Sequence, residues 1–190
     1  AHLAQLYDLI KKNGCTHTIM YCSIMPSSDG KCGGLRAALR KYMMLDDCSV
    51  PQSMIITTGH SLSVLSSPGC GEKAIEDSVF EILGVPAIHA LHTNYSYQQW
   101  VESIRGMDPM YLGNVYTAEF DGQIVSVPMT CTEQIQTPFG MKDKPVLIPE
   151  RADKIIKLAK NWAMLSKIPS KDKKVAIILH NMPPRADMIG

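Results

Sequence analysis

The sequence has no excess of charge of either sign. Among its 190 residues, Lys and Arg total 19 and Asp and Glu total 18, which gives a formal net charge of +1. A nucleic-acid-binding protein needs a basic face that displaces counterions from phosphates. The charge balance therefore argues against nucleic acid as a partner.

Long apolar runs are also missing. Apolar segments such as Val175 to Leu179 are far shorter than the ~20 residues that a membrane-spanning helix needs. No pattern typical of a secretory signal peptide opens the sequence, and the 6 cysteines are scattered without a zinc-type pair. We therefore expect a cytoplasmic protein with free thiols and no membrane span.

Several catalytic signatures are absent as well. The sequence contains no Walker-type phosphate loop, no Gly-x-Gly-x-x-Gly after a strand, no nucleophile elbow and no His-Glu-x-x-His zinc pattern. The stretch Lys31-Cys32-Gly33-Gly34 precedes an expected helix, where its amides could hold an anion, but loop geometry explains these glycines equally well. We expect that the chain does not itself hydrolyse ATP.

Strand and helix signals alternate along the first half of the sequence. Strands are predicted over 17–24, 53–58 and 87–91, and helices over 3–10, 35–44 and 74–83. Short connections between such elements predict a mostly parallel sheet flanked by helices, an α/β fold of Rossmann-like or flavodoxin-like type. We assign residues 1–95 to this domain.

The second half has different signals. Ser96 and Gln99 form a capping-box pattern that opens a helix through Trp100 to Ile104. Asp121-Gly122 stands between two β-rich runs, 115–120 and 123–127, and predicts a β-hairpin. The polar, irregular stretch 130–145 predicts a loop or an excursion.

A long helix is then expected from Pro149, with one apolar face. That face comprises Ala152, Ile155, Ile156, Ala159, Trp162 and Ala163. We expect both Trp100 and Trp162 in the core, and a further strand at Val175–Leu179. Residues 96–190 are accordingly predicted to form a helix, a hairpin, a long helix and the start of the next α/β unit.

Two sets of side chains are candidates for chemistry. If the strand before Asp121 is regular, Glu119 and Asp121 share a face, where paired carboxylates can accept protons or hold a hard cation. Asp before Gly is often present for the turn alone, so Glu119 is the more suggestive residue. His89 and His92 surround the end of a predicted strand, with His60 after another, and could bind a metal or transfer protons. Hydrogen-bonded histidines at a sheet edge are the more common origin of this pattern.

Three passages resemble, in the same order, motifs of the family that comprises the large subunit of cobaltochelatase (CobN) and the H subunit of magnesium chelatase. They are LGVPAIH at 83–89, AEFDGQI at 118–124, and the stretch from Lys173 through the loop His180–Arg185 to Ile189-Gly190. The helix start from Ser96 to Trp100 and the segment Trp162 to Leu165 also fit this family.

The resemblance implies an internal fragment of a tetrapyrrole-binding large subunit. Such a subunit belongs to a ligase that inserts a divalent metal, Co²⁺ in preference to Mg²⁺, into a corrin precursor or porphyrin. AAA+ ATPase subunits and adaptor subunits would be its partners, and ATP would be hydrolysed by those partners. We expect the fragment alone to be inactive.

Site roles follow from the same resemblance. Glu119 matches the Glu of a family motif and is expected to act in proton transfer, with Asp121 assisting. His89, His92, His180 and Arg185 are expected to contact substrate. The alternative is a non-catalytic α/β module that binds a small ligand or a partner, or a domain with an architectural role only.

Overall fold

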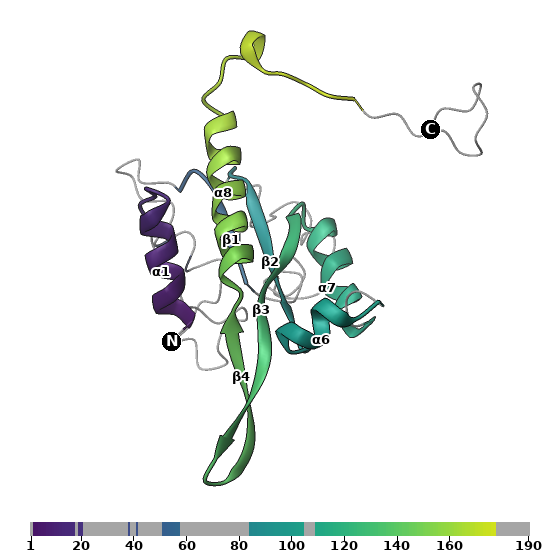
Figure 1. Ribbon diagram of the computed structural model, residues 1–190. Helices are drawn as coiled ribbons and strands as arrows, with labels where there is room; N and C mark the ends of the chain where they lie inside the picture. The colour runs from purple at the N-terminus through teal and green to yellow at the C-terminus, as the bar shows by residue number, and fades with distance from the viewer. Residues whose placement is uncertain are drawn as a thin grey trace, which may run out of the picture.

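The structure is a computed structural model that describes residues 2–17, 19–20, 38, 41, 51–57, 84–104 and 109–177 (Figure 1). Its elements, in chain order, are α1 (His2–Lys12), β1 (Met54–Ile56), β2 (Ala87–Thr93), α6 (Tyr97–Glu102), α7 (Pro109–Phe120), β3 (Ile124–Thr137), β4 (Gly140–Leu147), α8 (Pro149–Leu165) and the 3₁₀ turn η1 (Ser170–Asp172).

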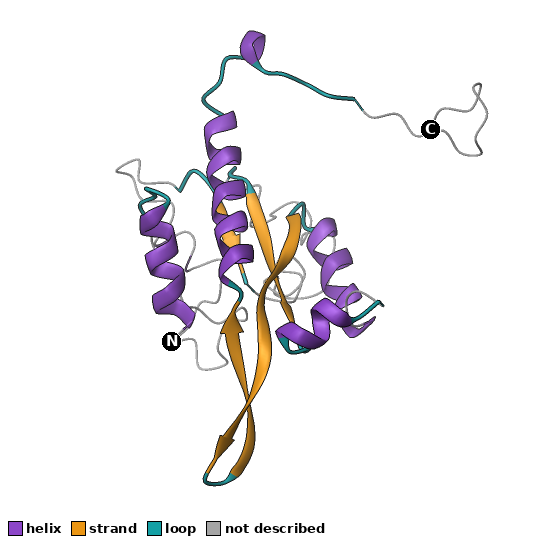
Figure 2. Ribbon diagram, in the orientation of Figure 1, coloured by secondary structure: helices purple, strands orange, loops and turns teal. Residues whose placement is uncertain are grey.

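These strands form one four-stranded sheet in the order β1-β2-β3-β4 (Figure 2). The pairs β1–β2 and β2–β3 are parallel, and β4 runs antiparallel to β3. Helices flank this sheet, so the predicted α/β fold with a mostly parallel sheet is confirmed. The sheet continues across the predicted domain boundary at residue 95, and the division into two domains stays a prediction.

The core lies between the sheet and α8. Its buried members are Ile88 and Ala90 of β2, Met129 of β3, Leu147 of β4, and Ala152, Ile155 and Ala159 of α8. The sequence anticipated this face because its apolar residues recur at helical spacing from Pro149, which occupies the first turn of α8. Trp162 is an exception: it is 38% exposed rather than in the core, although its neighbour Ala163 is buried.

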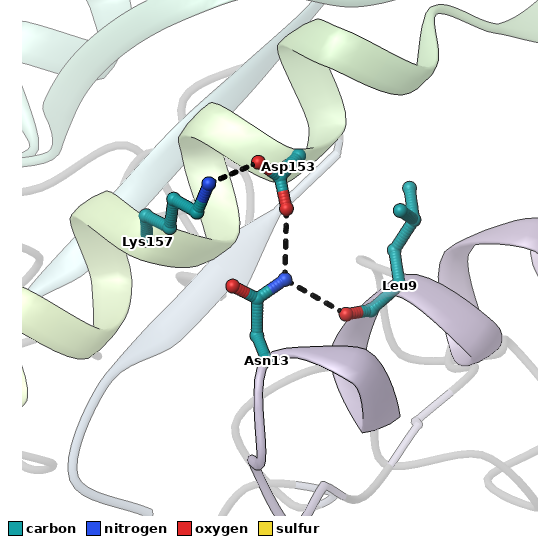
Figure 3. Close-up of polar contacts among 4 residues, drawn as sticks. All are labelled: Leu9, Asn13, Asp153 and Lys157. Atoms are coloured by element: carbon teal, nitrogen blue, oxygen red, sulfur yellow. Dashed lines mark hydrogen bonds and ion pairs between the residues drawn. The ribbon is translucent and has the colours of Figure 1, made fainter.

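Helix α1 packs beside α8, although the two are far apart in the sequence (Figure 1). Its last helical residue is Lys12, and Gly14 follows with a φ of 68°, the left-handed conformation that the sequence signal Asn13-Gly14 favours at a helix end. The Asn13 side-chain amide donates to Leu9 O and to Asp153 Oδ1, both at 2.9 Å (Figure 3). Lys157 Nζ lies 2.6 Å from Asp153 Oδ2, so one carboxylate links the end of α1 to α8.

The predicted hairpin around Asp121-Gly122 is wrong. Residues 115–120 are the last turns of helix α7, and Asp121-Gly122 ends that helix. Gly122 has φ 75°, its N–H donates to Glu119 O, and the Gln123 N–H donates to Ala118 O, each at 2.9 Å. These bonds define a Schellman cap. A Gly with positive φ suits both a hairpin turn and a helix C-cap, so the dipeptide alone could not distinguish them.

The expected loop over 130–145 is also wrong. Most of this segment forms the antiparallel pairing of β3 with β4, from Thr130↔Leu147 to Thr137↔Gly140. The turn residues Pro138-Phe139 connect the two strands. Beyond Glu133 the side chains of β3 are mostly exposed on both faces, so the segment lacks the alternation of apolar and polar residues that identifies a strand.

The other predicted elements have mixed outcomes. The capping box at Ser96 is confirmed, although α6 ends at Glu102 rather than Ile104. The strands at 53–58 and 87–91 correspond to β1 and β2. Residues 175–177 belong to no strand, and Val175 and Ile177 are exposed, so that part of the strand prediction is wrong.

The helix over 74–83 lies outside the described residues, as do most of the strand over 17–24 and most of the helix over 35–44. Of the latter helix, Ala38 and Lys41 are described and helical. Across the described ranges, no helix has both the length and the apolar character to cross a membrane.

Candidate functional site

Glu119 and Asp121 lie at the end of α7, next to the first residue of β3. Glu119 is exposed, whereas Asp121 is buried and accepts a hydrogen bond from Gln123 Nε2 at 3.3 Å. The expectation that both share a strand face is wrong, because Glu119 belongs to helix α7 and Asp121 to the turn that follows it. Asp121 is therefore suited to supporting the helix end, and Glu119 presents the carboxylate that solvent or substrate can reach.

His89 and His92 are separated by the fold. Both belong to β2, and because side chains alternate along a strand, residues three apart point to opposite faces. His89 lies in the middle of the sheet, between Ile56 of β1 and Val125 of β3, and is 1% exposed. Only His92 lies at the carboxyl end of the strand, where ligands gather in α/β sheets.

The ring of His92 is held by two threonine hydroxyls of β3. His92 Nδ1 lies 2.8 Å from Thr130 Oγ1, and Nε2 lies 3.0 Å from Thr132 Oγ1. Burial lowers the pKa of His92 from its ordinary 6.5, which favours the neutral ring. A neutral imidazole donates at one nitrogen and accepts at the other, and hydroxyls can meet both needs. This geometry matches the hydrogen-bonded alternative for the histidines better than a metal ligand.

A shallow pocket of about 220 Å³ lies at the base of the β3–β4 ribbon. It is lined by Tyr97, Cys131, Glu133, Val146, Leu147, Ile148, Pro149 and Glu150. Sites for drug-sized ligands have volumes of about 300–1,000 Å³, so this pocket has room for a small group and not for a tetrapyrrole.

Tyr97 connects two carboxylates at the rim of this pocket. Its backbone N–H donates to Glu133 Oε1 at 3.0 Å, and its hydroxyl donates to Glu150 Oε1 at 3.3 Å. The buried Cys131 thiol donates to Val146 O at 3.8 Å and to Glu133 Oε1 at 3.9 Å. Burial, and after it the charge of Glu133, raise the pKa of Cys131, so the thiol stays protonated and is a poor nucleophile.

No signal in the sequence pointed to this pocket as a whole. Two of its four strand residues, Cys131 and Glu133, fall in the segment 130–145 that was expected to be a loop. The capping box at Ser96 was the one local signal, because it fixes where α6 begins and so where the Tyr97 N–H points.

The predicted site residues are not brought into one cluster. Ile88 pairs with Ile124, beside Glu119 and Asp121, whereas His92 pairs with Thr130. Four residues of strand, about 13 Å, separate these two ends. The described ranges hold no group of three His, Cys, Asp or Glu side chains that could bind a metal ion.

Other candidates lie outside the described residues: His60, His180, Arg185 and the glycine-rich stretch 31–34. Both cysteines that the structure describes, Cys15 and Cys131, are free thiols, as predicted.

The whole chain matches a known protein family. The sequence profile of the family described as CobN/Magnesium Chelatase matches residues 1–190. The uncharacterized protein MJ0908 of Methanocaldococcus jannaschii is 29% identical over 196 residues, covering 100% of this chain and 15% of its own length. The aerobic cobaltochelatase subunit CobN of Pseudomonas aeruginosa is 30% identical over 110 residues, covering 56% of this chain and 9% of its own length.

The fold is also found in a solved structure. The catalytic subunit of cobaltochelatase from Mycobacterium tuberculosis is similar with a TM-score of 0.66 and 22% identity, over 94% of this chain and 14% of that chain. Across these relatives and a second M. jannaschii protein, the chain spans 15%, 13% and 9% of the curated proteins it matches.

Proposed function

The chain belongs to the CobN/magnesium chelatase family, and from this membership we propose that it is a segment of the tetrapyrrole-binding large subunit of a metal chelatase. The complete protein would be a ligase that inserts a divalent metal into a corrin precursor or porphyrin. The family match over the whole chain carries this proposal. The 30% identity to a cobaltochelatase subunit favours Co²⁺ over Mg²⁺ as the metal substrate.

Metal insertion makes two chemical demands on such a subunit. Two pyrrole protons must leave the macrocycle, and the metal ion must lose part of its hydration shell. Glu119 is the candidate base, because its carboxylate is exposed on the last turn of α7. Asp121 acts as a positioning residue in this proposal, since its burial and its bond from Gln123 hold the end of that helix.

In this proposal, partner subunits supply the energy for metal insertion, and the macrocycle site includes residues outside the pocket described above. Family membership implies AAA+ partner subunits that act with an adaptor subunit in the cytoplasm, and we propose that these partners hydrolyse ATP. The pocket of about 220 Å³ is too small for a tetrapyrrole. This pocket is therefore not proposed as the macrocycle site, and the segment alone is not expected to insert metal.

The decisive experiment replaces Glu119 in the full-length subunit assayed with its ATPase partners. Glu119→Gln keeps the side-chain shape and removes the base, so we expect the insertion kcat to fall about 10²- to 10⁴-fold. Tetrapyrrole affinity, measured by fluorescence quenching, should change little. The matched control is Glu102→Gln, another exposed Glu at the end of a helix, which should keep normal insertion.

Near-normal insertion by Glu119→Gln would remove this residue from the mechanism. If Glu119→Gln changes neither metal insertion nor tetrapyrrole affinity, the two results together would favour a non-catalytic, partner-binding role for the segment.

A further inference from the structure

The outer half of the β3–β4 ribbon extends beyond the sheet (Figure 1). The last pair between β2 and β3 is Thr93↔Cys131, whereas β3 and β4 stay paired out to Thr137↔Gly140. About six residues of each strand, roughly 20 Å, thus have no third strand beside them. A two-stranded ribbon alone in water is only marginally stable, so this half gains most from a surface that covers it.

Apolar side chains gather at the end of this ribbon. Phe139 is 100% exposed, Met141 59% and Ile135 38%, and we call these three residues the ribbon tip. Ile135 pairs with Lys142 and Gln136 pairs with Met141. Directly paired residues share a face and successive residues alternate, so Ile135 and Met141 lie on opposite faces. The tip is therefore apolar on both faces and at its end, which suits insertion between two walls better than lying flat on a surface.

The turn that carries Phe139 is held in place by Thr137. The Thr137 hydroxyl donates to Gly140 O at 2.7 Å and accepts from the Phe139 N–H at 3.3 Å. Phe is not a residue that turns favour, and no bond of the turn uses its side chain. Its position is thus fixed by the backbone, and its ring is presented outward in a preorganised form.

The ribbon is poorly suited to strand addition or to electrostatic docking. The edge strand β4 carries Lys142, Lys144 and Pro145, residues that discourage pairing with a further strand. The charges of Lys142 and Lys144 are balanced by Asp143 on β4 itself and by Glu133, which pairs with Lys144, so the ribbon has no net charge to attract an oppositely charged partner. Recognition must therefore come from the apolar side chains of the tip.

The length of the relatives favours a cover from the same polypeptide. This chain corresponds to 15% of its full-length M. jannaschii relative and to 14% of the solved cobaltochelatase catalytic subunit. Most of the polypeptide of such a full-length subunit therefore lies outside this segment and is available to pack against it. A permanent contact within one chain also suits an uncharged, apolar tip, since permanent interfaces are the more hydrophobic kind.

We propose that the ribbon tip inserts into an apolar cavity formed by another part of the same full-length polypeptide, outside residues 1–190, with Phe139 as the anchor. The contact fixes this α/β segment relative to the rest of the subunit. This inference rests on the proposed function in one respect, that the chain is a segment of a longer subunit; it does not depend on metal insertion, and its test needs neither tetrapyrrole nor metal.

A photo-crosslinking amino acid at position 139 of the full-length protein tests the proposal directly. A benzophenone side chain is aromatic and preserves the anchor. After irradiation, mass spectrometry should find residue 139 joined to a peptide of the same molecule outside residues 1–190, with no dimer on a denaturing gel. Irradiation in urea is the control and should give no such product. A dimer, a product only with a separate partner subunit, or no product would each overturn the proposal.

Tryptic cleavage gives a second, independent measurement. Lys142 lies next to the tip, and trypsin does not cut between Lys144 and Pro145, so cleavage after Lys142 reports on the ribbon. Phe139→Ser should raise the cleavage rate there roughly tenfold or more, the change expected when the burial of a Phe side chain is lost. Ile104→Ser is the matched control, because Ile104 is also 100% exposed and lies outside the ribbon. Equal rates in wild type and Phe139→Ser would contradict the proposal.

Discussion

The inner half of β3 (Ile124–Cys131) and its outer half (Thr132–Thr137) form one continuous strand, but they differ in burial and in the elements that lie beside them. The inner half contains the buried residues Pro128, Met129 and Cys131, whereas residues 134–136 of the outer half are exposed. Both halves are rich in β-branched residues. The inner half has β2 beside it and α8 packed against it, while the outer half pairs with β4 and not with β2. Neighbours in space, rather than residue type, therefore decide which half is core.

This difference has an energetic consequence. Residues of the inner half are ordered together with the main core, so they should open only when the whole sheet unfolds. The outer half makes few apolar contacts within the described residues, so it should open locally at a much smaller free-energy cost.

The largest expected effect contrasts one substitution in the two regions. Ile155, at 0% exposure, packs in the core between α8 and the sheet, whereas Ile135 lies in the outer ribbon. Ile155→Ala should lower the free energy of unfolding by about 2–5 kcal/mol, through lost burial and an unfilled cavity. Ile135→Ala should change it by less than about 0.5 kcal/mol in the 190-residue chain. Urea unfolding measures both, and equal losses would show that the ribbon is part of the core.

A smaller change in the free energy of unfolding is expected when either of two glycines with positive φ is replaced by Ala. Gly122 ends α7 with φ 75°, and Gly140 follows the ribbon turn with φ 114°. Within the described structure, a Cβ at either position meets no atom within 4 Å, so the cost of Ala is backbone strain alone. Gly122→Ala should lower the free energy of unfolding by about 1–2 kcal/mol.

Gly140→Ala should instead leave global stability nearly unchanged, because the ribbon can open locally to relieve the strain. Hydrogen exchange checks this directly: amides of β4 next to the turn should exchange faster, and those of β2 should not. Faster exchange throughout the sheet would mean that the two halves of β3 unfold as one unit.

The smallest effect concerns the junction between the two regions, where His92 contacts Thr130 and Thr132. Burial lowers the pKa of His92 below 6.5, so the unfolded chain takes up this proton more readily than the folded chain. The contribution of His92 to stability is therefore full above pH 6.5 and declines as the pH falls through its lowered pKa. NMR titration of the ring should give a midpoint below 6.5, and His92→Gln should remove this part of the pH dependence. A midpoint at or above 6.5 would contradict the buried, neutral ring.

Local signals in the sequence predicted much of the fold outside the β3–β4 ribbon. The apolar face of α8, the capping box at Ser96 and the stop at Asn13-Gly14 are each written within a few neighbouring residues, and the structure has all three. The same local reasoning failed at Asp121-Gly122, where two different structures require the same positive φ. It failed in the ribbon as well, since a strand exposed on both faces has no apolar periodicity.

The sequence predicted the candidate site less well than it predicted the fold. Which of Glu119, Asp121, His89 and His92 lie together depends on the register of β2 against β3, and that register contains two irregularities between His89 and His92. No local pattern encodes those shifts. They place His92 opposite Thr130 and leave Glu119 at the other end of the strands.

The sequence by itself determined the family, the α/β class and the buried face of α8, because motif order and apolar periodicity are properties of the chain alone. Only the tertiary structure decided that Asp121-Gly122 ends a helix, that 130–145 is a paired ribbon, and that the polar groups of β2 separate onto two faces. Each of these depends on which segments become neighbours in space, and the burial that selects among local alternatives exists only once the chain has folded.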